Sequence, residues 1–256
     1  MSVIQDQQNR TRAGHVAKGP LRVDSDLLLT HYPGQTDTLV VTFNSAGHGL
    51  WTDQPDEFIG MARGADGHHV IAVSDLRRSW YSAPGLQERV VEDIRDFADA
   101  NGIARIAMLG SSMGGYGALS FAERVGAQAA MGIVPQFSMH PRFNEPRWSE
   151  LRPGMVEKRL GTLGSYLTGQ TRAFCLTGAK DRHDRRHYNM ITRRCPVQGY
   201  LLKDCGHDLA LQLKTMGHLP RLVAAMIAGE DEVFDTILSP LVQRETAASA
   251  AGSGED

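Results

Sequence analysis

Short apolar runs alternate with segments of helical periodicity along most of this 256-residue chain, and this alternation constrains the fold more than any other feature. Two strands are expected within residues 21–32, and six further runs are predicted to be strands: 39–43, 68–75, 104–109, 129–137, 171–181 and 197–204. Helical patterns separate them at 55–63, 87–102, 113–126 and 184–194, and one closing helix is expected from about 208 to 228. Strands that alternate with helices predict an α/β fold, with a mostly parallel sheet covered by helices on both faces.

The composition is typical of a soluble globular protein. Apolar residues make up 41% of the chain and charged residues 22%, and the formal net charge is −2. This balance favours neither nucleic acid nor a membrane as a partner, and no apolar run approaches the roughly 20 residues of a membrane span. The N-terminus has no secretory signal, and three scattered cysteines fit neither a disulfide framework nor a metal site. We therefore expect a cytoplasmic protein; the sequence leaves its oligomeric state open.

The sequence divides into one domain and two tails. We expect a polar N-terminal tail over residues 1–20, a single α/β domain over 21–242, and a disordered tail over 243–256 that is rich in small and polar residues. Residues 138–170, rich in Pro, Gly, Arg and Trp, interrupt the alternation between two strands. Such an insertion is expected to lie over the strand ends, where α/β folds bind ligands, as a small cap.

The segment GSSMGG joins the strand predicted at 104–109 to the helix that follows it. A nucleophile on a sharp strand-to-helix turn needs small residues two positions before and after it, because strand and helix nearly touch there. Gly110 and Gly114 meet this need around Ser112, so Ser112 is the candidate nucleophile. The segment fits neither a P-loop nor a dinucleotide-binding turn. The amide of Met113, at the start of the new helix, is expected to stabilise an oxyanion.

A serine nucleophile needs a base and an acid that orients the base. His207 is the candidate base because it lies in a short Gly-containing loop after the last predicted strand. Asp181 is the preferred acid because it lies at the end of the strand predicted at 171–181, three residues after Gly178, whereas Asp184 resembles a first-turn charge that complements the helix dipole. His187, in the same basic helical segment, is expected to be solvated.

The elbow GSSMGG, the strand end GAKD and the loop CGHD, in this order, make the chain resemble the α/β-hydrolase superfamily over roughly residues 39–229. The resemblance implies that Ser112 is the nucleophile, Asp181 the acid and His207 the base, and it implies no metal and no other cofactor. The family's usual His-Gly after the third strand is replaced here by Phe43-Asn44. Matched by position, Ser45 would supply the second oxyanion amide, with Asn44 as the alternative.

Aromatic residues lie in three segments that are expected near the site: His48 and Trp51 after the strand at 39–43, Trp80 and Tyr81 after the strand at 68–75, and Trp148 in the insertion. Together with nearby arginines they suit a small acyl substrate such as a carbohydrate ester, or one that bears a carboxylate. The alternative is that the tryptophans anchor loops and the arginines pair with neighbouring glutamates.

These observations favour a serine hydrolase that cleaves a small ester or thioester through an acyl-enzyme on Ser112. One alternative is an acyltransferase that passes the acyl group to an alcohol or sugar. A second alternative, from another class, is a catalytically silent hydrolase-like module that binds a partner, because this fold hosts many functions.

Overall fold

The computed structural model describes residues 18–47 and 54–242. The predicted C-terminal tail, most of the predicted N-terminal tail and two predicted site residues, His48 and Trp51, lie outside this range. The N-terminal tail was expected to extend to residue 20, but the first strand already begins at Gly19.

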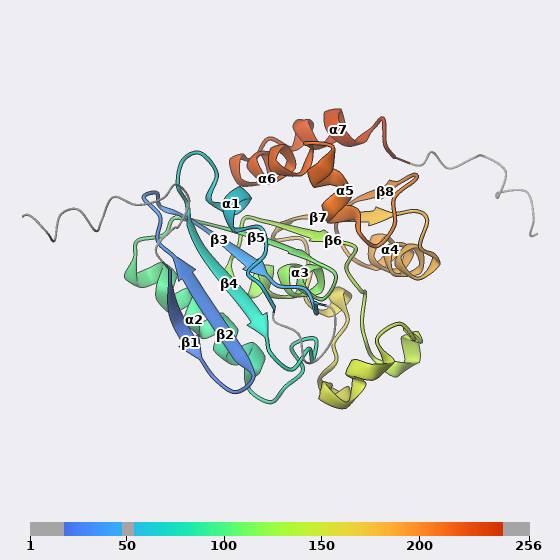
Figure 1. Cartoon of the computed structure of the whole chain (residues 1–256), viewed down its shortest axis with the longest axis horizontal. Coiled ribbons are helices and arrows are strands. Elements are labelled where there is room, and N and C mark those ends of the chain that lie inside the picture. Colours follow the sequence, from blue (N-terminus) through green and yellow to red (C-terminus); the bar gives the residue numbers. More distant parts are fainter. Residues whose placement is uncertain (1–17, 48–53, 243–256) are drawn as a thin grey trace, which may run out of the picture.

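One eight-stranded sheet organises the described residues (Figure 1). Its strands are β1 (Gly19–Val23), β2 (Leu27–Tyr32), β3 (Thr38–Phe43), β4 (His69–Asp75), β5 (Arg105–Ser111), β6 (Ala129–Ile133), β7 (Arg172–Gly178) and β8 (Gln198–Leu202), in the order β1-β2-β4-β3-β5-β6-β7-β8. β3 to β8 run parallel, and β1 and β2 form an antiparallel edge. The carboxyl ends of the parallel strands therefore share one edge of the sheet, as the alternating pattern predicts.

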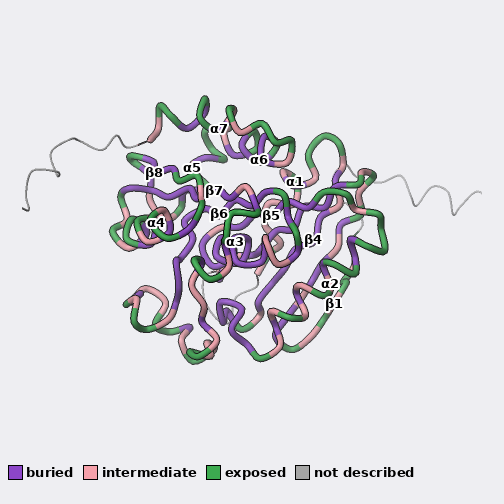
Figure 2. Tube along the Cα trace, turned by 180° about the vertical axis from the view of Figure 1, so that it is seen from behind, coloured by how far each residue is buried: buried purple, intermediate pink, exposed green. Residues whose placement is uncertain are grey.

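Helices cover both faces of the sheet. They are α1 (Ile59–Arg63), α2 (Leu86–Ala100), α3 (Met113–Val125), α4 (Arg182–Arg194), α5 (Leu209–Thr215), α6 (Leu219–Ala228) and α7 (Asp231–Leu238). One buried cluster joins α2, α3 and α4 to one face, and other clusters join α1, α5, α6 and α7 to the opposite face. Figure 2 shows the buried backbone running through the middle of the molecule between these layers.

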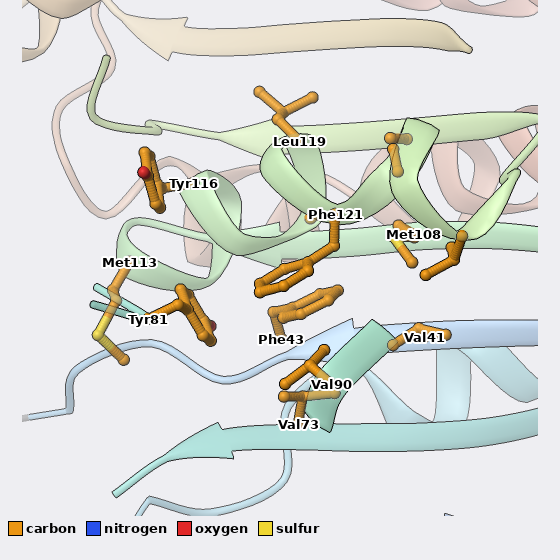
Figure 3. Close-up of a cluster of buried hydrophobic side chains, with 14 of the residues drawn as sticks. Val41, Phe43, Val73, Tyr81, Val90, Met108, Met113, Tyr116, Leu119 and Phe121 are labelled. Carbon is orange, nitrogen blue, oxygen red and sulfur yellow. The ribbon is translucent and has the colours of Figure 1, made fainter. Parts of the chain in front are cut away.

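The core beneath the predicted elbow is aromatic. Phe43 of β3 stacks on Phe121 of α3 with ring centroids 5.5 Å apart, and Tyr81 meets both rings edge-on (Figure 3). All three side chains are buried. Such ring contacts stabilise a core by more than the burial of apolar area alone. They therefore help to hold α3 in place against β3.

The predicted closing helix is two helices, and a third follows. Gly217, with φ 74°, separates α5 from α6, and Pro220 lies in the first turn of α6. Proline is tolerated in a first turn but costs about 3 kcal/mol in a helix interior, so a single helix could not continue through residue 220. α7, which the sequence analysis did not predict, packs Phe234 on Phe174 of β7 with centroids 4.1 Å apart.

The insertion between β6 and β7 is a series of 3₁₀ turns, at Pro141–Phe143, Ser149–Gly154, Glu157–Arg159 and Leu163–Ser165 (yellow-green to yellow in Figure 1). Contacts with the body of the domain hold it in several places. The amide of Val156 donates to Ser82 Oγ at 2.8 Å. Near its end, the Glu123 carboxylate of α3 accepts the amides of residues 168, 169 and 170.

Candidate active site

Ser112 lies on a strained turn between β5 and α3. Its φ of 54° and ψ of −119° are unusual for a residue with a side chain. A Cβ on Gly110 would lie 2.2 Å from the carbonyl oxygen of Gly114, and a Cβ on Gly114 would lie 2.0 Å from the carbonyl oxygen of Phe43. The two glycines are therefore required by backbone contacts, as the Gly-x-Ser-x-Gly pattern predicts.

Gly114→Ala should destabilise the fold by about 3 kcal/mol, because the new methyl group meets backbone that has little room to move. The matched control is Gly60→Ala in α1, where a Cβ meets nothing within 4 Å. That change should be neutral or slightly stabilising, because alanine favours a helix interior. Thermal unfolding of both variants measures the difference. Equal stabilities would show that the turn can relax around a side chain.

His207 and Ser112 lie within hydrogen-bond distance. His207 follows β8, and its Nε2 is 3.1 Å from Ser112 Oγ. On the other side of the ring, Nδ1 is 2.8 Å from a carboxylate oxygen of Asp184. Asp184 is almost fully buried, so water competes little for its carboxylate. These three side chains form a continuous hydrogen-bonded series that joins the turn before α3, the loop after β8 and the first turn of α4.

The carboxylate beside His207 is Asp184, not Asp181 as the sequence analysis expected. Asp181 is the N-cap of α4: its side chain accepts the amides of His183 and Asp184 at 2.8 and 3.0 Å. Burial would raise the pKa of Asp181, but the amide of Asp184 and nearby cations outweigh it and hold that pKa below its usual value. Each aspartate thus occupies the position expected for the other.

A helical signal could have identified Asp184. Asp184, His187 and Ile191 follow the i, i+3, i+7 spacing of one helix face, and all three are buried. The expectation that His187 is solvated is also wrong, because it lies against Glu145 and the amide of Phe137. A charged residue that shares a face with a buried isoleucine is turned towards the protein and away from solvent.

The predicted oxyanion donors differ in whether they are already engaged. Among the described residues, the turn and cap hydrogen bonds include none from the amide of Met113, which starts α3. The amide of Ser45 donates to Glu57 Oε2 at 3.2 Å, and the Ser45 hydroxyl donates to Oε1 at 2.6 Å. The amide of Asn44 belongs to the sheet, donating to Val73, so Asn44 is not placed as a donor. Burial raises the pKa of Glu57 more than its bonds with Ser45 lower it.

The aromatic residues predicted to bind substrate separate into two groups. Trp148 lines the cleft beside His207, with ring centroids 5.7 Å apart. Trp80 and Tyr81 are 1% and 0% exposed, so they contribute to packing and do not line the cleft. The Trp80 indole N–H donates to Gln136 Oε1 at 2.9 Å.

Gln136 is a fully buried polar residue that the sequence analysis did not consider. Because its Oε1 accepts from Trp80, its Nε2 faces Ser112 Oγ at 3.4 Å. The serine oxygen therefore lies between an imidazole and an amide. The only sequence signal is a polar residue three positions after the apolar strand β6, which is too common a pattern to identify a site.

Two adjoining hollows open at the strand-end edge. One has a volume of about 460 Å³ and is lined, among the described residues, by Ser112 and His207 together with Ser45, Glu57, Trp148, Asp208 and Leu211. The second, of about 350 Å³, shares Ser45, Glu57, Ser111, Ala210 and Leu211 with the first. Both sizes suit a small ligand. Within residues 18–47 and 54–242 no cluster of His, Cys, Asp and Glu could hold a metal ion.

Comparison with known proteins identifies the fold through structure alone. No family model matches the sequence, and no curated protein matches it. A capsule O-acetyltransferase of Neisseria meningitidis serogroup A superposes with a TM-score of 0.63 and 14% identity, covering 91% of this chain and 99% of that one. FphF, a fluorophosphonate-binding serine hydrolase of Staphylococcus aureus, gives a TM-score of 0.56 and 15% identity, covering 82% and 97%. The chain has the α/β-hydrolase fold.

The α/β-hydrolase fold does not determine the reaction. The bottromycin epimerase BotH also superposes, with a TM-score of 0.50 and 15% identity over 82% of this chain and 99% of that one. The reaction of this α/β-hydrolase-fold chain therefore depends on the side chains at its site, which the fold does not specify. None of the helices in the described part of the chain is long and apolar enough to cross a membrane.

Proposed function

We propose that the protein is a serine hydrolase that cleaves a small ester or thioester through an acyl-enzyme on Ser112. The observation that carries this proposal is the hydrogen-bonded series from Ser112 through His207 to Asp184, with distances of 3.1 and 2.8 Å, at a strained strand-to-helix turn. A structural role for Ser112 explains neither the strain nor the alignment of the two bonds, whereas strained backbone is concentrated at functional sites.

In the proposed reaction His207 Nε2 accepts the Ser112 proton as Oγ attacks the acyl carbon. Asp184 keeps the proton on Nδ1 and stabilises the imidazolium that forms. The imidazolium then donates its Nε2 proton to the departing alcohol or thiol, which leaves the acyl group on Oγ. Water repeats the sequence against the acyl-enzyme and releases the carboxylic acid.

The charges of the described cleft favour a neutral or cationic substrate. Two carboxylates, Glu57 and Asp208, line it. Two insertion arginines that could have recognised a carboxylate are engaged elsewhere: Arg147 with acidic side chains and Arg152 with backbone carbonyls. We therefore favour an uncharged ester, such as one on a carbohydrate, over a substrate that bears a carboxylate.

The test is acyl transfer from p-nitrophenyl acetate, a small neutral ester. Release of p-nitrophenol together with an increase of one acetyl group in the intact mass supports the acyl-enzyme, and turnover in water supports hydrolysis. Absence of both from folded protein contradicts the proposal.

Transfer to an alcohol is the second candidate, and the superposition with an O-acetyltransferase favours it. Adding monosaccharides to the same reaction separates the two outcomes. An acetylated sugar formed at the expense of acetate supports transfer, and acetate alone supports hydrolysis.

Glu57→Gln should increase the rate of acylation about tenfold, a change of about 1.4 kcal/mol. In the structure the Ser45 amide already donates to the Glu57 carboxylate. The negative charge of that carboxylate also disfavours an oxyanion formed near it. Glutamine keeps the size and removes the charge. The matched control is Asp56→Asn, because Asp56 bonds Tyr32 and Asn44 but not Ser45. A lower rate in Glu57→Gln alone would instead show that the carboxylate contributes to the reaction.

A further inference from the structure

We propose that Arg147, on the insertion, is a positioning residue for Asp184, the acid of the proposed Ser112–His207–Asp184 triad: it fixes the Asp184 carboxylate and limits how strongly acidic groups hold a proton on His207. This inference rests on the proposed function, because it assigns Arg147 an effect on the same His207 proton transfers. It concerns a residue that does not line the Ser112 cleft.

The two oxygens of Asp184 have different partners. Oδ2 lies 2.8 Å from His207 Nδ1, and Oδ1 lies 2.8 Å from Arg147 Nη1. A carboxylate with a donor on each oxygen cannot rotate without breaking one bond. Arg147 therefore fixes the plane of the carboxylate, and through it the orientation of the imidazole towards Ser112.

Arg147 is itself held rigidly by the insertion. Its Nε and Nη2 donate to the two oxygens of Glu145 at 2.9 and 2.7 Å, a bidentate pair. Glu145 is 1% exposed. Burial would raise the pKa of Glu145, but hydrogen bonds from His187 and Arg147 outweigh it and hold the pKa well below its usual range. Glu145 thus remains charged, and Arg147 keeps one orientation.

His187 completes the support. Its Nδ1 accepts the amide of Phe137 at 3.1 Å, so the ring proton of the neutral imidazole lies on Nε2 and is donated to Glu145 at 3.0 Å. Side-chain hydrogen bonds thus run from His187 of α4 through Glu145 and Arg147 of the insertion back to Asp184 at the start of α4.

The charges around His207 give Arg147 a second effect. Asp184 of α4 and Asp181, the cap of α4, lie near His207; Glu145 of the insertion pairs with Arg147, and Asp208 and Glu57 line the same cleft as His207. Arg147 lies 3.2 Å from Asp181 as well as 2.8 Å from Asp184, and Lys180, next to Asp181, pairs with the exposed Asp204. Without Arg147, the uncompensated carboxylates would favour a proton on His207 and keep it from accepting the serine proton.

The alternative is that Arg147 only tethers the insertion. A buried ion pair by itself is weak evidence for stabilisation, because desolvation offsets its attraction. A tether and a positioning residue predict different pH–activity profiles when Arg147 is replaced. A tether affects stability alone, whereas a charge beside the acid also changes the pH dependence of the activity.

The experiment measures p-nitrophenyl acetate hydrolysis and fluorophosphonate labelling from about pH 5 to pH 9 in Arg147→Met, Arg147→Lys and Glu145→Gln. In Arg147→Met we expect kcat to fall about 100-fold with little change in KM, and the acid limb of the profile to move up by about one pH unit. Arg147→Lys keeps the positive charge, so its acid limb should lie at the same pH as in wild type. Glu145→Gln should move the acid limb to lower pH, because it leaves the Arg147 cation uncompensated.

Arg152→Met is the matched control. Arg152 lies on the same insertion and donates only to the carbonyls of Met139 and Glu145, so its loss weakens the insertion without removing a charge from Asp184. We expect a lower Tm and an unchanged acid limb. If Arg147→Met and Arg152→Met lose stability alike and neither moves the limb, the inference is wrong while the proposed function stands. If wild type is neither labelled nor active, both are wrong.

Discussion

Ser112→Ala should abolish covalent labelling by a fluorophosphonate and reduce ester hydrolysis by about 10⁶-fold. The reason is the geometry of the turn: Ser112 Oγ lies 3.1 Å from His207 Nε2 and 3.4 Å from the Gln136 amide, and the substitution removes the oxygen that the reagent would modify. Intact-mass measurement should show one adduct on wild type and none on the variant.

The neighbouring Ser111 supplies the control for that experiment. Ser111 ends β5 and lines both hollows, but it lacks the glycine spacing of the elbow. Ser111→Ala should retain labelling, and His207→Ala should slow it severely while leaving Ser112 in place. If folded wild type takes up no adduct, the hydrolase proposal is wrong and a silent binding module becomes the better hypothesis.

Asp184→Asn should reduce kcat by about 10⁴-fold, the cost of the same change in a characterised triad. The asparagine amide would face His207 Nδ1 with a donor where an acceptor is needed, which favours the wrong tautomer of the ring. The measurement is the rate of p-nitrophenyl acetate hydrolysis, with circular dichroism to show that α4 is intact.

Asp181→Asn is the matched control, on the same turn of the same helix. Asparagine caps a helix about as well as aspartate, so the two bonds that Asp181 accepts from the start of α4 are kept. We expect activity close to that of wild type, because this change leaves the bonds of Asp184 to His207 and Arg147 in place. A larger loss in Asp181→Asn than in Asp184→Asn would restore the assignment that the sequence alone favours.

The sequence predicts those parts of the fold and candidate site that local rules dictate. The strand positions follow from apolar runs, and the elbow follows from the need for glycine where β5, α3 and β3 nearly touch. The position of His207 followed from its loop after the last strand, and the structure places it against Ser112. Each of these features depends on residues that are close together in the sequence.

The choice between Asp181 and Asp184 as the acid depended on the residue at which α4 begins, which the sequence does not determine. If α4 began three residues later, Asp184 would be the cap and Asp181 would lie before the helix. The structure begins α4 at Arg182, and this makes Asp181 the cap and turns Asp184 inward. Glu57 and Gln136 could not be predicted, because their contacts with Ser45 and Ser112 join segments that no motif connects.

The contacts of the insertion also determine how a ligand reaches Ser112. Arg147 holds the segment at α4, Ser82 holds it near its middle, and Glu123 holds its return to β7. A lid that swings needs free hinge residues at its base, and this segment is fastened at both sides of its 3₁₀ turns. Under the proposed function, we therefore expect substrate to reach Ser112 without a swing of this segment, which would act as a fixed wall that limits the size of the acyl group.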